Sequence, residues 1–330
     1  YFHFFETFFK KEKIDCVISR PDDLLGSVVV NIAQNKNIFI TIQMVSRIFG
    51  YFFWSYGPYS DHNYIEDFYL RNKNKKFKNR KKNSLTFGSS SSFRKQNLIN
   101  EFKFKNLFKI FIIITVDRIL FIYKDFIKKT KSNRLTYISL IKRKFMAYFR
   151  NRQYLKISEK SLNNNIKKPY FYFPLPEEIE YFTHSLTKDF NNIYAIIIQL
   201  SSSIPSGYNL LVKEHTPNIG TKPYLYYKNL LKRPNIKIVD YKVSSSKLIN
   251  KSEAIVTTAG TVALEAAEAK KKALIFANNV EYMHLDNIIK VDNINNLKKF
   301  VKLALTPMTE KERKNLDKQL ELYKVFLLVK

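Results

Sequence analysis

The segment 254-AIVTTAGTVALEAAEA-269 decides the fold of this chain. Residues 254–257 are apolar and β-branched, which predicts a short buried strand. Gly260 interrupts the run, and residues 262–269 are strong helix formers. The segment therefore predicts a strand, a hydroxyl-rich glycine turn and a helix, with Thr258 or Thr261 capping the helix start. An ordinary capped helix in a strand–helix unit fits the same residues.

A turn of this kind directs backbone N–H groups and the positive end of the helix dipole out of the sheet, where an anion binds. The dipole contributes only about 0.3–1 kcal/mol, so hydroxyls and a cation must contribute as well. We assign Thr258, Gly260 and Thr261 to phosphate binding. Glu265 lies one helical turn after Thr261 on the same face, where a carboxylate suits ribose hydroxyls better than a phosphate.

A second polar group follows the apolar run 209–212, namely Lys213, Glu214 and His215. A cation, a carboxylate and an imidazole placed together suit phosphate binding and proton transfer. The alternative is a solvated strand end with an incidental histidine. Both polar groups belong to one series of alternating strands and helices, so their strands should end at the same edge of a parallel sheet, where ligands bind. We therefore favour the interpretation as a site.

Composition limits the class of protein. The 330 residues suggest about two domains, and a hydrophobic share of 45% is sufficient for real cores. The single cysteine, Cys16, excludes a disulfide framework and a thiolate metal site. Histidines and acids do not recur at ligand spacing, so we expect no metal site. The longest apolar run, 110–116, is too short to span a bilayer.

The pattern along the chain divides it into three parts. Residues 1–70 indicate an N-terminal Rossmann-like half, whose start we expect to lie upstream of Tyr1, with strands at 14–19 and 38–42 and a helix at 21–33. We interpret Arg47, which follows the second strand, as a surface arginine or an anion ligand, and the aromatic segment 49–59 as core or interface. Residues 71–165 are a basic, low-complexity linker and helical segment that we expect to complete the N-terminal domain. Residues 166–330 alternate strands and helices, which predicts a C-terminal Rossmann-like domain with a doubly wound parallel sheet. The predicted elements include a strand at 236–239 and a closing helix at 310–326.

Most of the formal charge of +29 lies in the middle part, where bases outnumber acids by about six to one between residues 71 and 160. Such a segment binds nucleic acid, rests on an anionic membrane, or is a solvated surface. No zinc-finger spacing, helix-turn-helix or RNA-recognition motif is present in the sequence, so we expect no specific nucleic acid. We expect peripheral contact with an anionic membrane, where each base contributes roughly 1 kcal/mol, or no partner.

Several motifs of the C-terminal part together resemble one family, the capsular polysaccharide biosynthesis proteins related to bacterial β-Kdo transferases. The resemblance covers roughly residues 168–285. Its motifs are Tyr172-Phe173-Pro174-Leu175, Glu180, 211-LVKEH-215, the turn 234–237, and 258-TAGT-261 with Glu265.

This sequence departs from the family at four places. Pro176, Ile179 and Thr216 stand where the family usually has histidine, proline and proline. Asn278 and Asn279 replace a loop that commonly contains glycine. Two interpretations therefore stay open, namely a degenerate copy of the enzyme and an active enzyme.

The resemblance implies an α/β glycosyltransferase of the GT-B type, with two Rossmann-like domains, parallel sheets, a cleft between them and a basic insertion. The C-terminal half, 166–330, would bind a nucleotide-sugar donor as substrate, with no cofactor. In Kdo transferases this donor is CMP-Kdo, whose single phosphate would suit Lys213, His215 and the 258–261 turn. Glu265 would bind ribose, and Glu180 and His215 would be catalytic.

The same resemblance implies a glycan or lipid-linked glycan acceptor of surface polysaccharide, and work in the cytoplasm at the inner face of the plasma membrane. Two other functions stay open. One is a non-catalytic basic protein that binds an anionic membrane or polymer through residues 71–160. The other is a nucleotide-sugar epimerase of similar fold, whose C-terminal half can show a similar turn.

Overall fold

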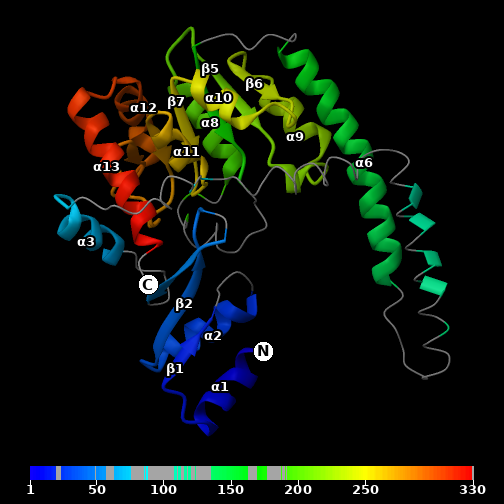
Figure 1. The fold of residues 1–330 in the computed structure, drawn as a ribbon. Helices are drawn as coiled ribbons and strands as arrows, with labels where there is room; N and C mark the ends of the chain where they lie inside the picture. Colours follow the sequence, from blue (N-terminus) through cyan, green and yellow to red (C-terminus); the bar gives the residue numbers. More distant parts are fainter. Residues whose placement is uncertain are drawn as a thin grey trace.

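The computed structural model describes residues 1–19, 24–48, 50–56, 63–75, 135–162, 169–176 and 192–328, with isolated positions between these ranges (Figure 1). Within them the chain forms two β-sheets, one of three strands and one of six, with helices packed against both. We call them the N-terminal sheet and the C-terminal sheet. The predicted α/β class is confirmed.

The C-terminal sheet is parallel at every pairing of its described strands. Its strand order is β6-β5-β4-β7-β8-β9, so β5 and β6 extend to one side of β4 while β7, β8 and β9 extend to the other. The order therefore reverses between β4 and β7, and ligands of open α/β sheets bind outside the carboxyl ends of the strands at such a point. The strands are β4 (Tyr170–Pro174), β5 (Asn209–Lys213), β6 (Ile236–Val239), β7 (Ala254–Thr257), β8 (Ala273–Ile275) and β9 (Ile288–Lys290).

Helices cover both faces of this sheet, as the doubly wound prediction required. Side chains alternate along β4, so Tyr170 and Tyr172 belong to one hydrophobic core while Phe171 and Phe173 belong to the other. The first core contains α10 (Ser245–Lys251), α11 (Val262–Glu268) and α13 (Glu310–Phe326). The second contains α6 (Leu135–Leu162), α8 (Ile193–Ser203), α9 (Tyr224–Leu230) and α12 (Leu297–Leu305).

The N-terminal sheet differs from the prediction of parallel sheets. β1 (Cys16–Ile18) pairs in parallel with β2 (Phe39–Val45), as predicted for strands separated by a helix, here α2 (Leu24–Asn35). β3 (Phe52–Tyr56) pairs antiparallel with β2. The connection after β2 turns at Gly50, whose φ is +85°, and so short a return leaves no room for the crossover that parallel strands need.

The strand β3 comes from the aromatic segment that we interpreted as core or interface rather than as a strand. Its side chains alternate, with Phe53 and Ser55 buried while Phe52, Trp54 and Tyr56 remain about half exposed. The hydroxyl of Tyr64 donates to the backbone oxygen of Trp54 and ties α3 (Asn63–Asn72) to the sheet. A further helix, α1 (Phe2–Lys11), packs against α2.

The C-terminal helix α13 returns to the N-terminal part of the chain. The ring of Phe326 contacts the rings of Phe53, Tyr64 and Phe68 at centroid distances of 6.4, 5.7 and 5.4 Å. Tyr69 of α3 donates to Asn315 Oδ1 at 2.9 Å. The closing helix predicted at 310–326 thus joins the two halves of the chain.

Helix α6 lies along the outside of the molecule and packs on β6 and α9 (Figure 1). The Tyr154 hydroxyl donates to the Val239 oxygen, and the Ile238 N–H donates to Ser161 Oγ at 2.9 Å. We predicted that residues 71–165 complete the N-terminal domain. In the described part of that range, however, α6 packs on β6 of the C-terminal sheet and on α9.

We expect Gly220→Ala to lower the free energy of unfolding by about 2–4 kcal/mol, as measured by urea denaturation. Gly220 has a φ of +79°, and a Cβ there would lie 2.4 Å from the backbone oxygen of Ala147 in α6. The substitution therefore combines left-handed strain with a clash against helix backbone.

The matched control is Gly207→Ala. Gly207 has a φ of +86°, but a Cβ there would meet nothing within 4 Å. Only the strain of about 1 kcal/mol should remain. Equal losses in the two variants would show that the contact between α6 and Gly220 does not constrain the fold.

Candidate functional site

The glycine turn after β7 is held by hydrogen bonds from three directions. The Gly260 N–H donates to Thr257 Oγ1 at 3.0 Å, and the Tyr282 hydroxyl donates to the Gly260 oxygen at 2.9 Å. Thr258 is buried, and its oxygen accepts from the Ala277 N–H at 3.0 Å. A Cβ on Gly260 would lie 2.8 Å from Thr257 Oγ1, so a larger residue there would displace the hydroxyl that closes the turn.

The predicted capping of the following helix is wrong for Thr261. This residue occupies the N-cap position of α11, but its side chain makes no capping hydrogen bond. Its φ and ψ of −54° and −22° are already helical, whereas a capping side chain requires an extended backbone. The hydroxyl that closes the turn is Thr257, one residue before the predicted pair.

Lys213 ends β5 and is 4% exposed. Its ammonium donates to the Val243 oxygen at 2.7 Å and to Ser245 Oγ at 2.8 Å. The Tyr172 hydroxyl of β4 donates to the same Ser245 oxygen at 3.3 Å. Lys213 is therefore fixed beneath the start of α10, with its positive charge next to the site and its ammonium bound to protein oxygens.

Glu265 is mostly buried on α11. Removal from water raises the pKa of its carboxyl above the ordinary 4.5, the nearby Glu268 raises it further, and Lys213 opposes both. The structure thus brings Lys213 and Glu265 into electrostatic contact across the β5–β7 edge, as the two sequence motifs predicted.

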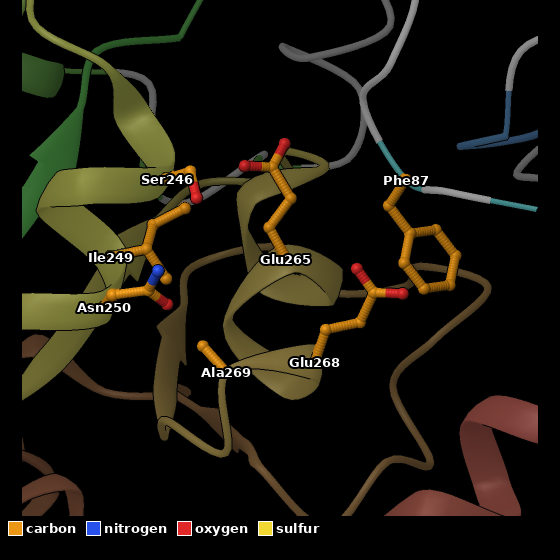
Figure 2. A pocket seen from close by; sticks show the side chains of 7 residues that line it. All are labelled: Phe87, Ser246, Ile249, Asn250, Glu265, Glu268 and Ala269. Atoms are coloured by element: carbon orange, nitrogen blue, oxygen red, sulfur yellow. The ribbon is translucent and has the colours of Figure 1, made fainter.

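A pocket of about 280 Å³ opens between α10 and α11. Figure 2 shows the carboxylate of Glu265 next to Ser246, with Glu268 reaching toward Phe87. Carboxylate, hydroxyl and amide groups in one small hollow suit a polyhydroxyl ligand. The lining residues are Phe87, Ser246, Ile249, Asn250, Glu265, Glu268 and Ala269.

Glu214 does not join Lys213 in one cluster, contrary to the prediction. Successive strand residues point to opposite faces, so Glu214 turns away from α10 toward α9. Its buried carboxylate lies 3.1 Å from Lys222 Nζ and accepts from the Tyr227 hydroxyl and, at 3.0 Å, from the His215 N–H. Burial raises the pKa of Glu214, and Lys222 opposes that rise. The His215 side chain is exposed.

The predicted site residues therefore lie along one sheet edge rather than at one point. β5 and β7 flank β4, so the strand ends that carry His215 and the glycine turn are separated by about 10 Å, two strand spacings. A ligand that contacts both strand ends must therefore carry several polar groups. Glu180, the predicted catalytic carboxylate, lies outside the described residues.

Arg47 connects the N-terminal sheet to the glycine turn. We interpreted it as a surface arginine or an anion ligand, but its Nε lies 2.7 Å from Glu281 Oε1, and Glu281 is 2% exposed. Its guanidinium also lies 5.8 Å from the ring centroid of Tyr282, the residue that binds Gly260. The pair thus supports the turn from the other half of the chain.

The contribution of α10 to the site was not predicted from the sequence. Ser245 binds Lys213, while Ser246 and Asn250 line the pocket. The available signal was the serine run 244–246, which follows the predicted strand 236–239 at the same sheet edge.

In the described part of the chain, no group of three or more His, Cys, Asp or Glu side chains could hold a metal ion. No helix in that part is both long and apolar enough to cross a bilayer.

No protein-family model matches the sequence, and no curated protein matches it. Among solved structures, the chain is similar to WaaG, a glycosyltransferase involved in lipopolysaccharide biosynthesis, with 16% identity and a TM-score of 0.32. That match covers 52% of this chain and 46% of WaaG, so the chain spans less than half of that protein.

The chain is also similar to UDP-GlcNAc 2-epimerase from Methanocaldococcus jannaschii in complex with UDP-GlcNAc and UDP. Identity is 16%, the TM-score is 0.39, and the match covers 99% of this chain and 80% of that one. A second structure of this epimerase gives 15% identity, a TM-score of 0.36 and coverage of 96% and 79%. We base no functional assignment on likenesses at these scores.

We expect Glu265→Gln to raise the melting temperature at pH 7–8 by about 2 °C. A carboxyl with a raised folded-state pKa favours its protonated form, so its charge costs stability once the pH exceeds the unfolded pKa. The advantage of glutamine should shrink as the pH falls through the pKa of Glu265. Thermal melts between pH 4 and pH 8 measure both effects.

The control for this prediction is Glu268→Gln on the same helix. Glu268 is exposed and forms an ion pair with Lys324 at 2.8 Å. Its amide variant loses this pair and relieves only the repulsion between Glu268 and Glu265, so it should gain less than Glu265→Gln at neutral pH. A lower melting temperature for Glu265→Gln at pH 7 would contradict the assignment of Glu265 as a buried carboxylate retained at a cost in stability.

Proposed function

We propose that the chain is a glycosyltransferase of surface polysaccharide biosynthesis. It transfers a sugar from a nucleotide-activated donor, CMP-Kdo or a similar molecule, to a glycan or glycolipid acceptor. The supporting observation is that a fixed hydroxyl-glycine turn, a buried lysine and a mostly buried carboxylate lie along the carboxyl edge of a doubly wound sheet, next to its β4–β7 reversal. The resemblance to capsular polysaccharide proteins over residues 168–285 supports the same assignment.

The donor would lie along the carboxyl edge of the C-terminal sheet. Its phosphate would contact the turn of Thr258, Gly260 and Thr261. The His215 imidazole would reach the same phosphate from the β5 end of the edge, and Lys213 would contribute its charge from beneath. The ribose hydroxyls would bind Glu265, whose carboxylate faces the pocket (Figure 2). A ligand hydroxyl there donates to a carboxylate that is already partly removed from water, which strengthens the hydrogen bond.

In the transfer step, an acceptor hydroxyl attacks the anomeric carbon of the donor sugar. Glu180 takes the hydroxyl proton or orients that group, a new glycosidic bond forms, and the bond to the donor phosphate breaks. The nucleotide leaves with its electron pair, and His215 balances the charge on the departing phosphate. We place this reaction in the cytoplasm, at the inner face of the plasma membrane.

A thermal-shift screen against CMP, UDP, GDP and ADP tests the donor site. At a hundred times its dissociation constant, one nucleotide should stabilise the fold by about 2.7 kcal/mol. The combined variant Thr261→Val and His215→Ala should remove the shift. A folded sample that shifts with no nucleotide would contradict donor binding and favour the non-catalytic alternative.

Turnover measurements test the chemistry. We expect His215→Ala and Glu180→Gln each to lower the rate of sugar transfer by about 10²–10⁴-fold. His3→Ala, a substitution of an exposed histidine on α1, is the matched control and should leave the rate unchanged. Unchanged turnover in both site variants would refute the assignment, and donor conversion without any acceptor would instead identify an epimerase.

A further inference from the structure

The outward face of α6 carries aromatic and basic side chains at helical spacing. Residues 142, 145, 149, 152 and 156 lie on one side of the helix, opposite the buried positions 151, 154 and 158. Phe145 is 38% exposed and Phe149 is 61% exposed. Lys142, Arg152 and Lys156 flank these rings on the same side and are exposed as well.

A neighbouring segment extends this apolar surface. The ring of Phe111 lies 6.3 Å from that of Phe145. The described large apolar side chains from 108 to 123 are all at least 40% exposed. They recur at helical spacing and are Phe108, Phe111, Ile112, Val116, Ile119 and Tyr123. We call these side chains and the outward face of α6 the outer α6 surface.

The part of the sequence that carries this surface is strongly basic. Between residues 71 and 160 the sequence holds 26 Lys and Arg against 4 Asp and Glu, which gives +22 of the total of +29. Exposed rings and aliphatic side chains among bases are the pattern of helices that lie in the headgroup region of a membrane. A solvated basic surface would not need the apolar side chains, and a large exposed apolar patch usually marks an interaction site.

We infer that the outer α6 surface binds an anionic phospholipid bilayer, with Phe145 and Phe149 among the acyl chains and Lys142, Arg152 and Lys156 at the lipid phosphates. Long basic side chains suit this position because their stems lie along apolar surface while their charged ends reach the headgroups. A nucleic acid would contact the basic side chains and the aromatic rings, but the aliphatic side chains of Ile112, Val116 and Ile119 would gain no favourable contact from it. The aliphatic side chains therefore favour lipid.

The opposite face of α6 contacts the loop that follows β5. Arg150 Nη1 donates to the Thr221 oxygen at 2.8 Å, and the Glu214 N–H donates to the Tyr154 hydroxyl at 3.2 Å. One rigid helix thus separates the proposed bilayer contact from the strand end that carries His215. Membrane binding here is independent of the donor site and stands whether or not the chain transfers sugar.

Co-sedimentation of the full chain with vesicles tests the inference. The protein should bind phosphatidylcholine vesicles that contain about 30 mol% phosphatidylglycerol, bind pure phosphatidylcholine about tenfold less, and lose affinity as salt rises. Phe145→Ser with Phe149→Ser should weaken binding to the anionic vesicles by about tenfold or more. The melting temperature should not fall, because both rings are exposed.

Leu303→Ser is the matched control. Leu303 is 44% exposed on α12 beside Lys299 and Lys302, so it repeats the chemistry at a different place. Its vesicle binding should equal that of the unmodified chain. Three results would each overturn the inference: no preference for anionic vesicles, full binding by the double phenylalanine variant, or equal weakening by Leu303→Ser. Binding to heparin and RNA that ignores the phenylalanine changes would identify a polyanion surface instead.

Discussion

The enclosure of β4 on both faces is the constraint on which the rest of the C-terminal half depends. Its four aromatic side chains, from Tyr170 to Phe173, are 0% exposed. A buried tyrosine needs a hydrogen-bond acceptor. Tyr170 donates to the Leu248 oxygen at 2.9 Å and Tyr172 to Ser245 Oγ at 3.3 Å, so the start and the middle of α10 are fixed against this strand. The same arrangement places Ser245, whose hydroxyl oxygen accepts from Lys213.

Much of the C-terminal fold could be predicted because an apolar run there usually ends at a polar residue. The strands at Ile236–Val239 and Ala254–Thr257 and the helix at Glu310–Phe326 have the predicted bounds. The edge strand Ile288–Lys290 was missed, since three partly exposed residues form no apolar run. The antiparallel strand Phe52–Tyr56 was missed because its aromatic residues fit a core, an interface or a strand equally well.

The candidate site was only partly predictable, for reasons of geometry. Residues that follow a strand or start a helix carry local signals, which is why Lys213, Gly260 and Glu265 could be named. The Arg47–Glu281 pair joins positions 234 residues apart, and no local pattern contains it. The cluster of Lys213 with Glu214 failed because neighbouring strand residues face opposite sides. That rule was available from the sequence, and applying it would have removed the error.

Trp54 gives the molecule a natural spectroscopic reporter. It is the only tryptophan in the chain and stands 42% exposed on β3, far from the C-terminal sheet in sequence. Its indole emission therefore reports the N-terminal sheet, while the far-ultraviolet dichroism is dominated by the larger helical half. Coincident transitions in the two signals would mean that the contacts of Arg47 and Phe326 make the halves one cooperative unit, and separate transitions would resolve two.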